Sequence, residues 1–386
     1  MDVKQVYELV NNATKEVLGE SAILEEDLSN VVDMGESLFN ANAVDNYVRS
    51  LVNHIGKVIF VNRPYRGGVP SVLMDGWEYG SVVEKISASL PQAQENESWE
   101  LQDGASYDPN IFYKPTVEAK FFNNRVTFEI PLSITERQVK ESFSNAVQLN
   151  AFVSMLYNEV DKSMTVKVDS LIQRTINNFI AETLYNYNTG GNYTGSGNTR
   201  AVNLLALYNA STSPAGTLTA AAALTDPEFL RFAAYTMKKY VDRMSKISNL
   251  FNIGGKARFT PRDMLHFVLL SDFAAAADVY LQSDVWHNEL TQLPEYETVP
   301  YWQGTGTDYS FTSISSINVM TSASHQVDAS GILGVMFDRD ALGVNNYNRR
   351  VTTNYNAKAE FWNNWYKMDA QYFNDTNENF VVFYVA

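Results

Sequence analysis

The residues of this chain that could do chemistry do not form a recognisable catalytic or metal-binding pattern. The four histidines share no ligand spacing, and neither HExxH nor His-x-His occurs. They are His54, His266, His287 and His325. His266 lies within an apolar run and is predicted to be a hydrogen-bonded core residue. With no cysteine, the chain has no disulfide, thiolate metal site or cysteine nucleophile, which fits a reducing cytosol.

The glycine-rich and acidic segments offer no better candidate. Gly67-Gly68 and Gly254-Gly255 are followed by no Gly-Lys-Ser/Thr phosphate loop and are expected to form turns. The triplet Gly195-Ser196-Gly197 lies in a polar segment and lacks the glycine spacing of a nucleophile elbow. Glu25 to Asp27 and Asp338 to Asp340 are expected to be solvated acidic turns. We therefore assign no catalytic, cofactor-binding or metal-binding residue and expect no cofactor.

An aromatic cluster near the C-terminus is the strongest indication of ligand binding. Aromatic rings beside a pair of carboxylates are typical of carbohydrate sites. The cluster comprises Trp362, Trp365, Tyr366, Tyr372 and Phe373, close to Asp369 and Asp375. Because Trp362, Trp365, Tyr366 and Asp369 fall at helical spacing, a buried stripe on a short helix is the favoured interpretation. A carbohydrate-binding or carbohydrate-active protein is the alternative from another functional class.

A basic cluster is the one concentration of positive charge in an acidic chain. Lys238, Lys239, Arg243 and Lys246 fall at spacings that partly share a helix face. The net charge of −15 disfavours tight or sequence-directed binding to nucleic acid. We expect the cluster to contact carboxylates of another subunit. The alternative is a solvent-exposed helix face that binds no partner.

The elements that position these residues begin with helices and a long hairpin. Helices are predicted over residues 2–18 and 41–54, with an irregular arm from 58 to 79. Three segments are β-prone: residues 81–90, 116–122 and 125–130. The polar stretch between the first two predicts a hairpin that projects from the molecule. The alternative is a hairpin packed on its own domain. Two capping boxes, at Ser133 and Thr135, predict that a short helix starts there.

The second half of the pattern alternates helices and strands. A long helix is predicted over residues 147–184, where a run of β-branched side chains at 165–168 could bend it. Asp226-Pro227 is predicted to cap a helix that runs to Ile247. Further strands are predicted at 264–270, 314–320, 331–337 and 378–385, and a helix at 271–281. The terminal strand must pair with an earlier one, because an open edge invites aggregation. The predicted helices and strands together indicate an α+β fold.

The composition and the N-terminal sequence indicate a folded protein and give no sign of a membrane protein. The chain has 386 residues with 45% hydrophobic content, which is enough for a substantial core. Aromatic residues reach 13%, a content that suits extensive protein interfaces. Neither a secretory signal nor a stretch of roughly 20 apolar residues is present, so no membrane partner is expected.

Three segments carry a resemblance to a known family. They are Phe121 to Ser133, Pro261 to Asp272, and Gly334 to Val344 with the Asn-rich residues that follow. In sequence order, the arm, two-stranded loop, long helix, central α/β part and returning strands resemble the major capsid proteins of tailed bacteriophages, with the Hong Kong 97-like fold. The resemblance extends from about Gly80 to Ala386.

The resemblance implies a domain organisation and a set of partners. Residues 1–80 would form an N-terminal arm, 81–132 an extended loop, 133–187 a peripheral domain with a spine helix, 188–336 an axial domain, and 337–386 a return to the peripheral domain. The subunit would be a non-enzymatic capsid protein that forms hexamers and pentamers of an icosahedral shell around double-stranded DNA. The implied partners are the chain itself, a portal, a decoration protein and, since no coiled-coil leader precedes the arm, a separate scaffolding protein.

Family members assemble in the host bacterial cytoplasm and reside in the virion, and this location is expected here. Some crosslink a loop lysine to a neighbour's asparagine. The loop contains Lys85, Lys114 and Lys120, but no motif identifies a reactive pair, so no crosslink is predicted. An encapsulin-like nanocompartment shell, or another virion structural protein, is the alternative that shares this assembly logic. DNA or an enzyme as the enclosed cargo would discriminate between them.

Overall fold

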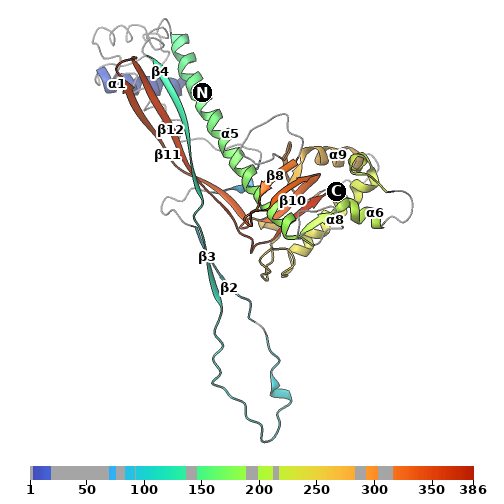
Figure 1. The fold of residues 1–386 in the computed structure, drawn as a ribbon. Coiled ribbons are helices and arrows are strands. Elements are labelled where there is room, and N and C mark those ends of the chain that lie inside the picture. The colour runs from blue at the N-terminus through green and yellow to red at the C-terminus, as the bar shows by residue number, and fades with distance from the viewer. Residues whose placement is uncertain are drawn as a thin grey trace. The chain divides into compact units, whose positions relative to one another are not determined.

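The computed structural model describes residues 3–18, 69–74, 83–91, 93–135, 146–187, 199–211, 217–282, 293–302 and 316–386. The described chain combines helices with four β-sheets, so the predicted α+β class is confirmed (Figure 1). It divides into two compact units, each described by itself below. The first comprises Met1–Glu78, Arg125–Gln173 and Val344–Gln371, and the second Tyr79–Asn124, Arg174–Gly343 and Tyr372–Ala386.

The helices follow the sequence expectations closely. The N-terminal and long helices appear as α1 (Val3–Leu18) and α5 (Ala146–Tyr187), and α5 is continuous through its β-branched run. At about 1.5 Å per residue, its 42 residues span about 63 Å. The predicted helix at 41–54 lies outside the described residues. The other α-helices in the described residues are α6 (Leu204–Ser211), α7 (Ala220–Ala223), α8 (Pro227–Met244) and α9 (Ser271–Gln282).

The start of α8 shows why the sequence rule works there. The Asp226 carboxylate accepts a hydrogen bond from the Phe229 amide at 2.8 Å, which satisfies a donor that has no partner within the helix. Pro227 occupies the first turn, where its missing N–H costs nothing. The predicted N-terminus of this helix is therefore confirmed, and the helix ends at Met244, three residues before the predicted limit.

The first unit contains a four-stranded sheet of order β1-β11-β12-β4. Its strands are β1 (Leu73–Met74), β11 (Leu342–Asn356), β12 (Phe361–Asn374) and β4 (Arg125–Thr135). Strand β12 alternates between half-buried and buried residues from Phe361 to Ala370, as a strand with one face on a core requires. It pairs antiparallel with β4, with Tyr366 opposite Ile130.

One prediction in this unit is wrong, and a second is wrong in part. The aromatic stripe from Trp362 to Asp369 lies on strand β12, not on a short helix. A helix does not start at Ser133, because β4 continues through this residue to Thr135. A helix capped by Thr135 would begin at residue 136, outside the described residues. The Ser133 hydroxyl lies 2.6 Å from the Asn363 Oδ1 atom on β12, so the side chain serves the sheet, not a helix cap.

The second unit is built around a five-stranded sheet of order β5-β13-β10-β6-β7. The terminal strand β13 pairs antiparallel with β10 and parallel with β5, so it is an interior strand, as its apolar sequence predicted. The strands are β5 (Ala201–Asn203), β13 (Phe380–Tyr384), β10 (Ile332–Asp338), β6 (Leu265–Leu270) and β7 (Glu297–Val299). A separate pair joins β8 (Ser316–Met320) to β9 (Gln326–Ser330).

Helices cover both faces of β13, which explains why all five of its residues are buried. Phe380 stacks on Phe179 of α5, with ring centroids 4.1 Å apart. Phe383 points to the other face and meets Tyr240 of α8 edge-on at 5.3 Å. Because successive side chains of a strand alternate between faces, a strand covered on both sides needs an uninterrupted apolar run. The sequence Phe-Val-Val-Phe-Tyr meets this need.

The predicted hairpin is also present in the second unit. Strands β2 (Val83–Ala88) and β3 (Val117–Phe122) pair antiparallel in a two-stranded ribbon. The chain between them forms a long open loop, interrupted by one turn of 3₁₀-helix at Glu97–Trp99 (Figure 1). Two more short 3₁₀ turns lie at Pro70–Val72 of the first unit and at Arg262–Met264 of the second. The ribbon and its loop hold the residues that suggest a function.

Candidate assembly interface

The loop between β2 and β3 displays large apolar side chains to solvent. Trp99 is 96% exposed and Phe112 is 84% exposed, whereas side chains of these types are normally largely buried. Leu90, Leu101, Tyr107, Ile111 and Tyr113 are exposed as well. Fully burying one large apolar side chain is worth about 1.5–3 kcal/mol. An isolated subunit forgoes this stabilisation at several positions at once, which marks the loop as a surface for another protein.

Local turns shape the loop. The Asn96 side chain accepts a hydrogen bond from the Ser98 amide at 2.8 Å, and Asp108 accepts one from the Asn110 amide at 2.9 Å. Gly104 adopts a φ of 82°, in the left-handed region that glycine enters without strain. The Gln102 amide donates to the Tyr107 hydroxyl at 3.1 Å. These contacts define bends in the loop and leave its apolar side chains uncovered.

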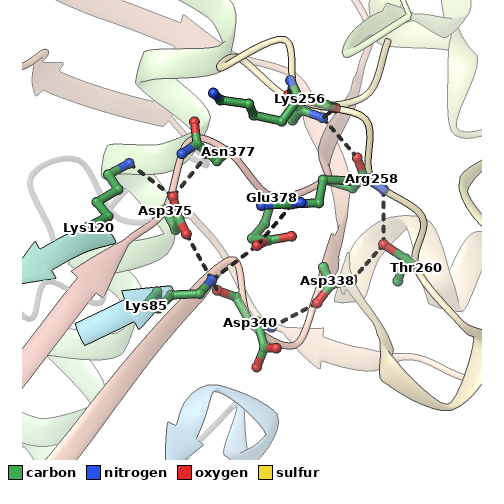
Figure 2. A network of polar contacts seen from close by, with 12 residues as sticks. Lys85, Lys120, Lys256, Arg258, Thr260, Asp338, Asp340, Asp375, Asn377 and Glu378 are labelled. Carbon is green, nitrogen blue, oxygen red and sulfur yellow. Dashed lines mark hydrogen bonds and ion pairs between the residues drawn. The ribbon is translucent and has the colours of Figure 1, made fainter. Parts of the chain in front are cut away.

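At the root of the ribbon, two lysines from opposite strands share one carboxylate. Lys85 of β2 lies directly opposite Lys120 of β3 in the antiparallel register. The Lys85 ammonium lies 2.8 Å from one oxygen of Asp375, and the Lys120 ammonium lies 2.9 Å from the other (Figure 2). Like charges directly opposite each other destabilise a ribbon, so the carboxylate between them offsets their repulsion. We call Lys85, Lys120 and Asp375 the root clamp.

Further ionic contacts surround the root clamp. Lys85 also donates to the Asp340 carbonyl at 2.8 Å and lies 3.3 Å from a Glu378 oxygen. That carboxylate oxygen lies 3.5 Å from Arg258 (Figure 2). On the other strand, Lys256 forms an ion pair with Glu118 of β3 at 2.6 Å. Each strand of the ribbon is therefore tied by charge to the body of the second unit.

The turn between β12 and β13 holds the clamp carboxylate in place. The Asp375 amide donates to the Ala341 carbonyl at 2.7 Å, and its side chain accepts a hydrogen bond from the Asn377 amide at 3.1 Å. The Gly254 amide donates to the Thr376 carbonyl at 2.8 Å. A Cβ atom at Gly254 would overlap the end of the Asn377 side chain, so a larger residue here would force Asn377 to move. The predicted turn at Gly254-Gly255 is confirmed, with Gly255 at a φ of 65°.

A buried polar chain continues from this turn and corrects one prediction. Asp338 was expected in a solvated acidic turn, but it is 5% exposed and accepts a hydrogen bond from the Thr260 hydroxyl at 2.7 Å. Asn379 donates to the same hydroxyl at 3.1 Å. Buried polar groups that have partners are tolerated, so this carboxylate stabilises the turn after β10. Arg339 and Asp340 are exposed, as expected for a turn.

The two carboxylates beside Lys85 differ in their electrostatics. Burial by itself would raise the pKa of Asp375, but hydrogen bonds from Lys85 and Lys120 outweigh it and hold the pKa below the ordinary value. Burial raises the pKa of Glu378, and the charges of Lys85 and Arg258 offset this only in part. Asp375 is therefore the carboxylate that the root clamp stabilises in its ionised form.

This difference predicts how acid affects the root clamp. Because folding lowers the pKa of Asp375, its contribution to stability is present above the ordinary pKa of 3.8 and is lost as the pH falls through the lower folded-state value. Folding raises the pKa of Glu378, so the folded state binds this proton more readily than the unfolded state does. The contribution of Glu378 to stability therefore increases as the pH falls toward its ordinary pKa of 4.5. Urea unfolding of the wild type and Asp375→Asn, followed from pH 7 to pH 3, should give a difference that persists to about pH 4 and shrinks below it. A difference that stays constant down to pH 3 would contradict this assignment.

Most of the aromatic residues near the C-terminus that suggested a carbohydrate site are inaccessible in the structure. Trp362, Tyr366 and Phe373 are buried. Asp369 pairs with Arg350 at 2.5 Å, and Asp375 is held by the root clamp. Both carboxylates are therefore engaged in ion pairs within the chain.

The other predicted sites contribute no chemistry within the described residues. His266 is half-buried against Phe337, and its Nε2 atom has no hydrogen-bond partner, so the predicted hydrogen bond is not seen at that atom. His325 stacks on Tyr185 at 4.4 Å. No group of three or more metal-ligating side chains occurs in the described part of the chain. His54, His287 and the segments Glu25–Asp27, Gly67-Gly68 and Gly195-Ser196-Gly197 lie outside it.

Comparison with known proteins identifies the family. A model of the Phi29-like phage major capsid protein family matches residues 10–384. The chain belongs to this family. As a major capsid protein, it assembles with copies of itself into the head shell of a phage and is a component of the virion capsid. This result confirms the predicted family and function. No curated protein matches the sequence significantly.

Solved structures support the fold. A chain of the capsid structure of Staphylococcus phage Andhra is 10% identical, with a TM-score of 0.50, over 84% of this capsid protein and 86% of that chain. A chain in the structure of the head fiber and inner core protein gp22 of native bacteriophage P68 is 8% identical, also with a TM-score of 0.50, over 85% and 86% of the two chains. Similarity at this identity concerns the fold. No helix in the described part of the chain is long and apolar enough to span a membrane.

Sequence reasoning missed the root clamp, although it noted both lysines. The sequence indicates Lys85 and Lys120 only as candidates for a crosslink, and Asp375 only as part of a sugar site. The register of β2 and β3 brings the lysines together, and only the return of the chain after β12 supplies the carboxylate. The signal available in the sequence was the turn Asp375-Thr-Asn-Glu378 immediately before the terminal strand.

Proposed function

We propose that this capsid protein forms hexamers and pentamers of an icosahedral shell around the double-stranded DNA genome of a tailed phage. The observation that carries the proposal is the loop between β2 and β3, whose large apolar side chains are exposed on the isolated subunit. A closed shell repeats the same contact many times, so individually modest interfaces sum to a stable assembly. The root clamp fixes the base of the loop against the second unit and so limits the entropy lost when the loop docks.

The domain organisation forms part of this proposal. Residues 1–80 form the N-terminal arm, and 81–132 form an extended loop that lies on a neighbouring subunit. Residues 133–187 and the returning segment 337–386 form the peripheral domain, with α5 as its spine helix. Residues 188–336 form the axial domain, which gathers around the five-fold and six-fold axes. The continuous course of α5 suits its role as the spine helix. Within the returning segment, β13 pairs with β5 and β10 and so completes the sheet of the second unit.

The proposed role is structural and not enzymatic. The potential catalytic and ligand-binding groups that the structure describes serve packing or ion pairs instead. We infer that the chain encloses DNA without sequence-specific binding, since its net charge is −15. A separate scaffolding protein, a portal and a decoration protein are the proposed partners, and the host bacterial cytoplasm is the proposed site of assembly.

Particles from the native source provide the test. Electron microscopy should show closed shells with five-fold and six-fold clusters of subunits, and nuclease treatment of intact particles should leave a protected genome of double-stranded DNA. A shell that instead protects an enzyme cargo would contradict the proposal and favour a nanocompartment. Open tubes or sheets without five-fold clusters would contradict the icosahedral arrangement.

A further inference from the structure

One face of α8 concentrates positive charge on this acidic chain. Its exposed or half-buried positions recur at three and four residues, so they form a continuous stripe. The stripe comprises Arg231, Tyr235, Lys238, Lys239, Asp242 and Arg243, and Lys246 follows two residues after the helix ends. The sequence showed the cluster, and the structure now shows that its members share an accessible face. We call this stripe, with Lys246, the α8 basic face.

Contacts within the subunit leave most of this positive charge uncompensated. Lys238, Lys239, Arg243 and Lys246 form no ion pair with the residues that the structure describes. The carboxylate on the stripe, Asp242, forms an ion pair with Arg262 at 2.5 Å, so its charge is already matched by a cation outside the stripe. Burial and then the nearby charge of Arg243 lower the pKa of Lys239, as expected where cations are crowded together.

Apolar side chains accompany the basic face. Tyr235 is exposed, and the Lys239 ammonium lies 5.2 Å from the centre of its ring. Beyond the end of α8, Ile247, Leu250 and Phe259 are each about half exposed. Backbone hydrogen bonds between Ser248 and Arg258 hold the segments that carry them next to each other. The surface therefore offers cations together with aromatic and aliphatic area, a combination that suits a protein partner.

The loop between β2 and β3 has the complementary chemistry. Among the loop side chains that the structure describes, four exposed carboxylates stand against one exposed cation, Lys114, and they alternate with the exposed apolar side chains. The carboxylates are Glu95, Glu100, Asp103 and Asp108. Within one subunit both surfaces remain exposed, so the loop does not cover the basic face of its own chain. A second copy supplies an acidic, apolar segment for every basic, apolar face.

We propose that the α8 basic face of one subunit receives the acidic, aromatic loop between β2 and β3 of a second copy. The inference rests on the proposed function, because it specifies which surface accepts the loop in the shell. Carboxylates of the loop would meet Lys238, Arg243 and their neighbours, while Trp99 and Phe112 would pack on the apolar side chains beside them. Nucleic acid fits less well, because a phosphate backbone leaves Ile247, Leu250 and Phe259 unused and the chain as a whole is acidic.

A charge exchange tests the proposal in the full-length protein. Lys238→Glu with Arg243→Glu should lower the yield of assembled shells about tenfold or more, and so should Glu100→Lys with Asp103→Lys, because like charges then face each other. Combining the four substitutions should restore most of the yield, since opposite charges meet again. Lys358→Glu, an exposed charge reversal on the turn between β11 and β12, is the matched control and should assemble as the wild type does.

The outcomes separate this proposal from its rivals. Loss of assembly in both double variants and recovery in the combination supports the pairing, whereas no recovery overturns it. Normal shells from the basic-face variant that no longer retain DNA would overturn it and assign the face to nucleic acid. Circular dichroism of the unassembled subunits checks that each variant folds. If the wild type itself forms no shells under any condition, the proposed function fails, not this inference alone.

Discussion

Replacing Asp375 with asparagine is expected to lower the free energy of unfolding by about 2–3 kcal/mol. The substitution keeps the size of the side chain but leaves Lys85 and Lys120 opposite each other without the charge between them. Breaking a fully buried ion pair typically costs about 3–5 kcal/mol. The lysine side chains here are 23% and 38% exposed, so solvent screening reduces the expected cost. Urea unfolding measures the change.

Amide hydrogen exchange shows whether that loss is local to the root clamp. Exchange should quicken in residues 83–88 and 117–122 of Asp375→Asn and remain unchanged in the interior strands β10 and β13. Asp340→Asn is the matched control, because its exposed side chain makes no ion pair with described residues and the substitution keeps the carbonyl that accepts from Lys85. Equal effects of the two substitutions would contradict the role assigned to Asp375.

Replacing Trp99 and Phe112 with serine is expected to reduce shell assembly by a factor of at least about 100. Each side chain contributes roughly 1.5–3 kcal/mol when it is buried, and the free subunit buries almost none of either. For the same reason, the free energy of unfolding of the isolated subunit should change by no more than about 0.5 kcal/mol. Light scattering during assembly and urea unfolding of the subunit measure the two quantities separately.

A conservative pair of substitutions distinguishes apolar packing from other effects on the loop. Trp99→Phe with Phe112→Leu retains most of the apolar area and should assemble within about tenfold of the wild type. If the serine variant assembles normally, the exposed side chains are not interface anchors. If it unfolds more readily as a subunit, Trp99 and Phe112 pack on their own chain in the free subunit and are not exposed to solvent.

The parts of the fold that the sequence predicted correctly are those governed by one dominant local rule. The carboxylate of Asp226 caps α8 because the chain offers a hydrogen-bond acceptor immediately before a proline and an apolar stripe. Strand β13 was predictable because a continuous apolar run near a terminus needs cover on both faces. Strand β11, rich in asparagine and arginine, carried no such signal and was not predicted.

Strand β12 shows why a helical pattern can mislead. Trp362 and Tyr366 are four residues apart, a spacing that shares a face in a helix and also in a strand. Asn364 lies between them at a buried position and disguises the alternation of apolar residues. Its side-chain amide donates to the Leu132 carbonyl of β4 at 3.3 Å, so the neighbouring strand makes a polar residue acceptable there.

The candidate interface was predictable in part. The long polar stretch between two β-prone segments indicated a hairpin, and the structure places its apolar side chains in solvent. The root clamp depends on Lys85, Lys120 and Asp375, which lie up to 290 positions apart in the sequence. Their meeting is a consequence of sheet register and chain return, which no local pattern encodes.

A side-chain-resolution reconstruction of the assembled shell by electron cryomicroscopy tests the central claim most directly. The claim is that the loop between β2 and β3 joins subunits while the root clamp fixes its base. The reconstruction should show Trp99 and Phe112 buried against a neighbouring subunit, with Lys85 and Lys120 still on Asp375. A shell in which both aromatic side chains remain exposed, or pack on their own chain, would contradict this account.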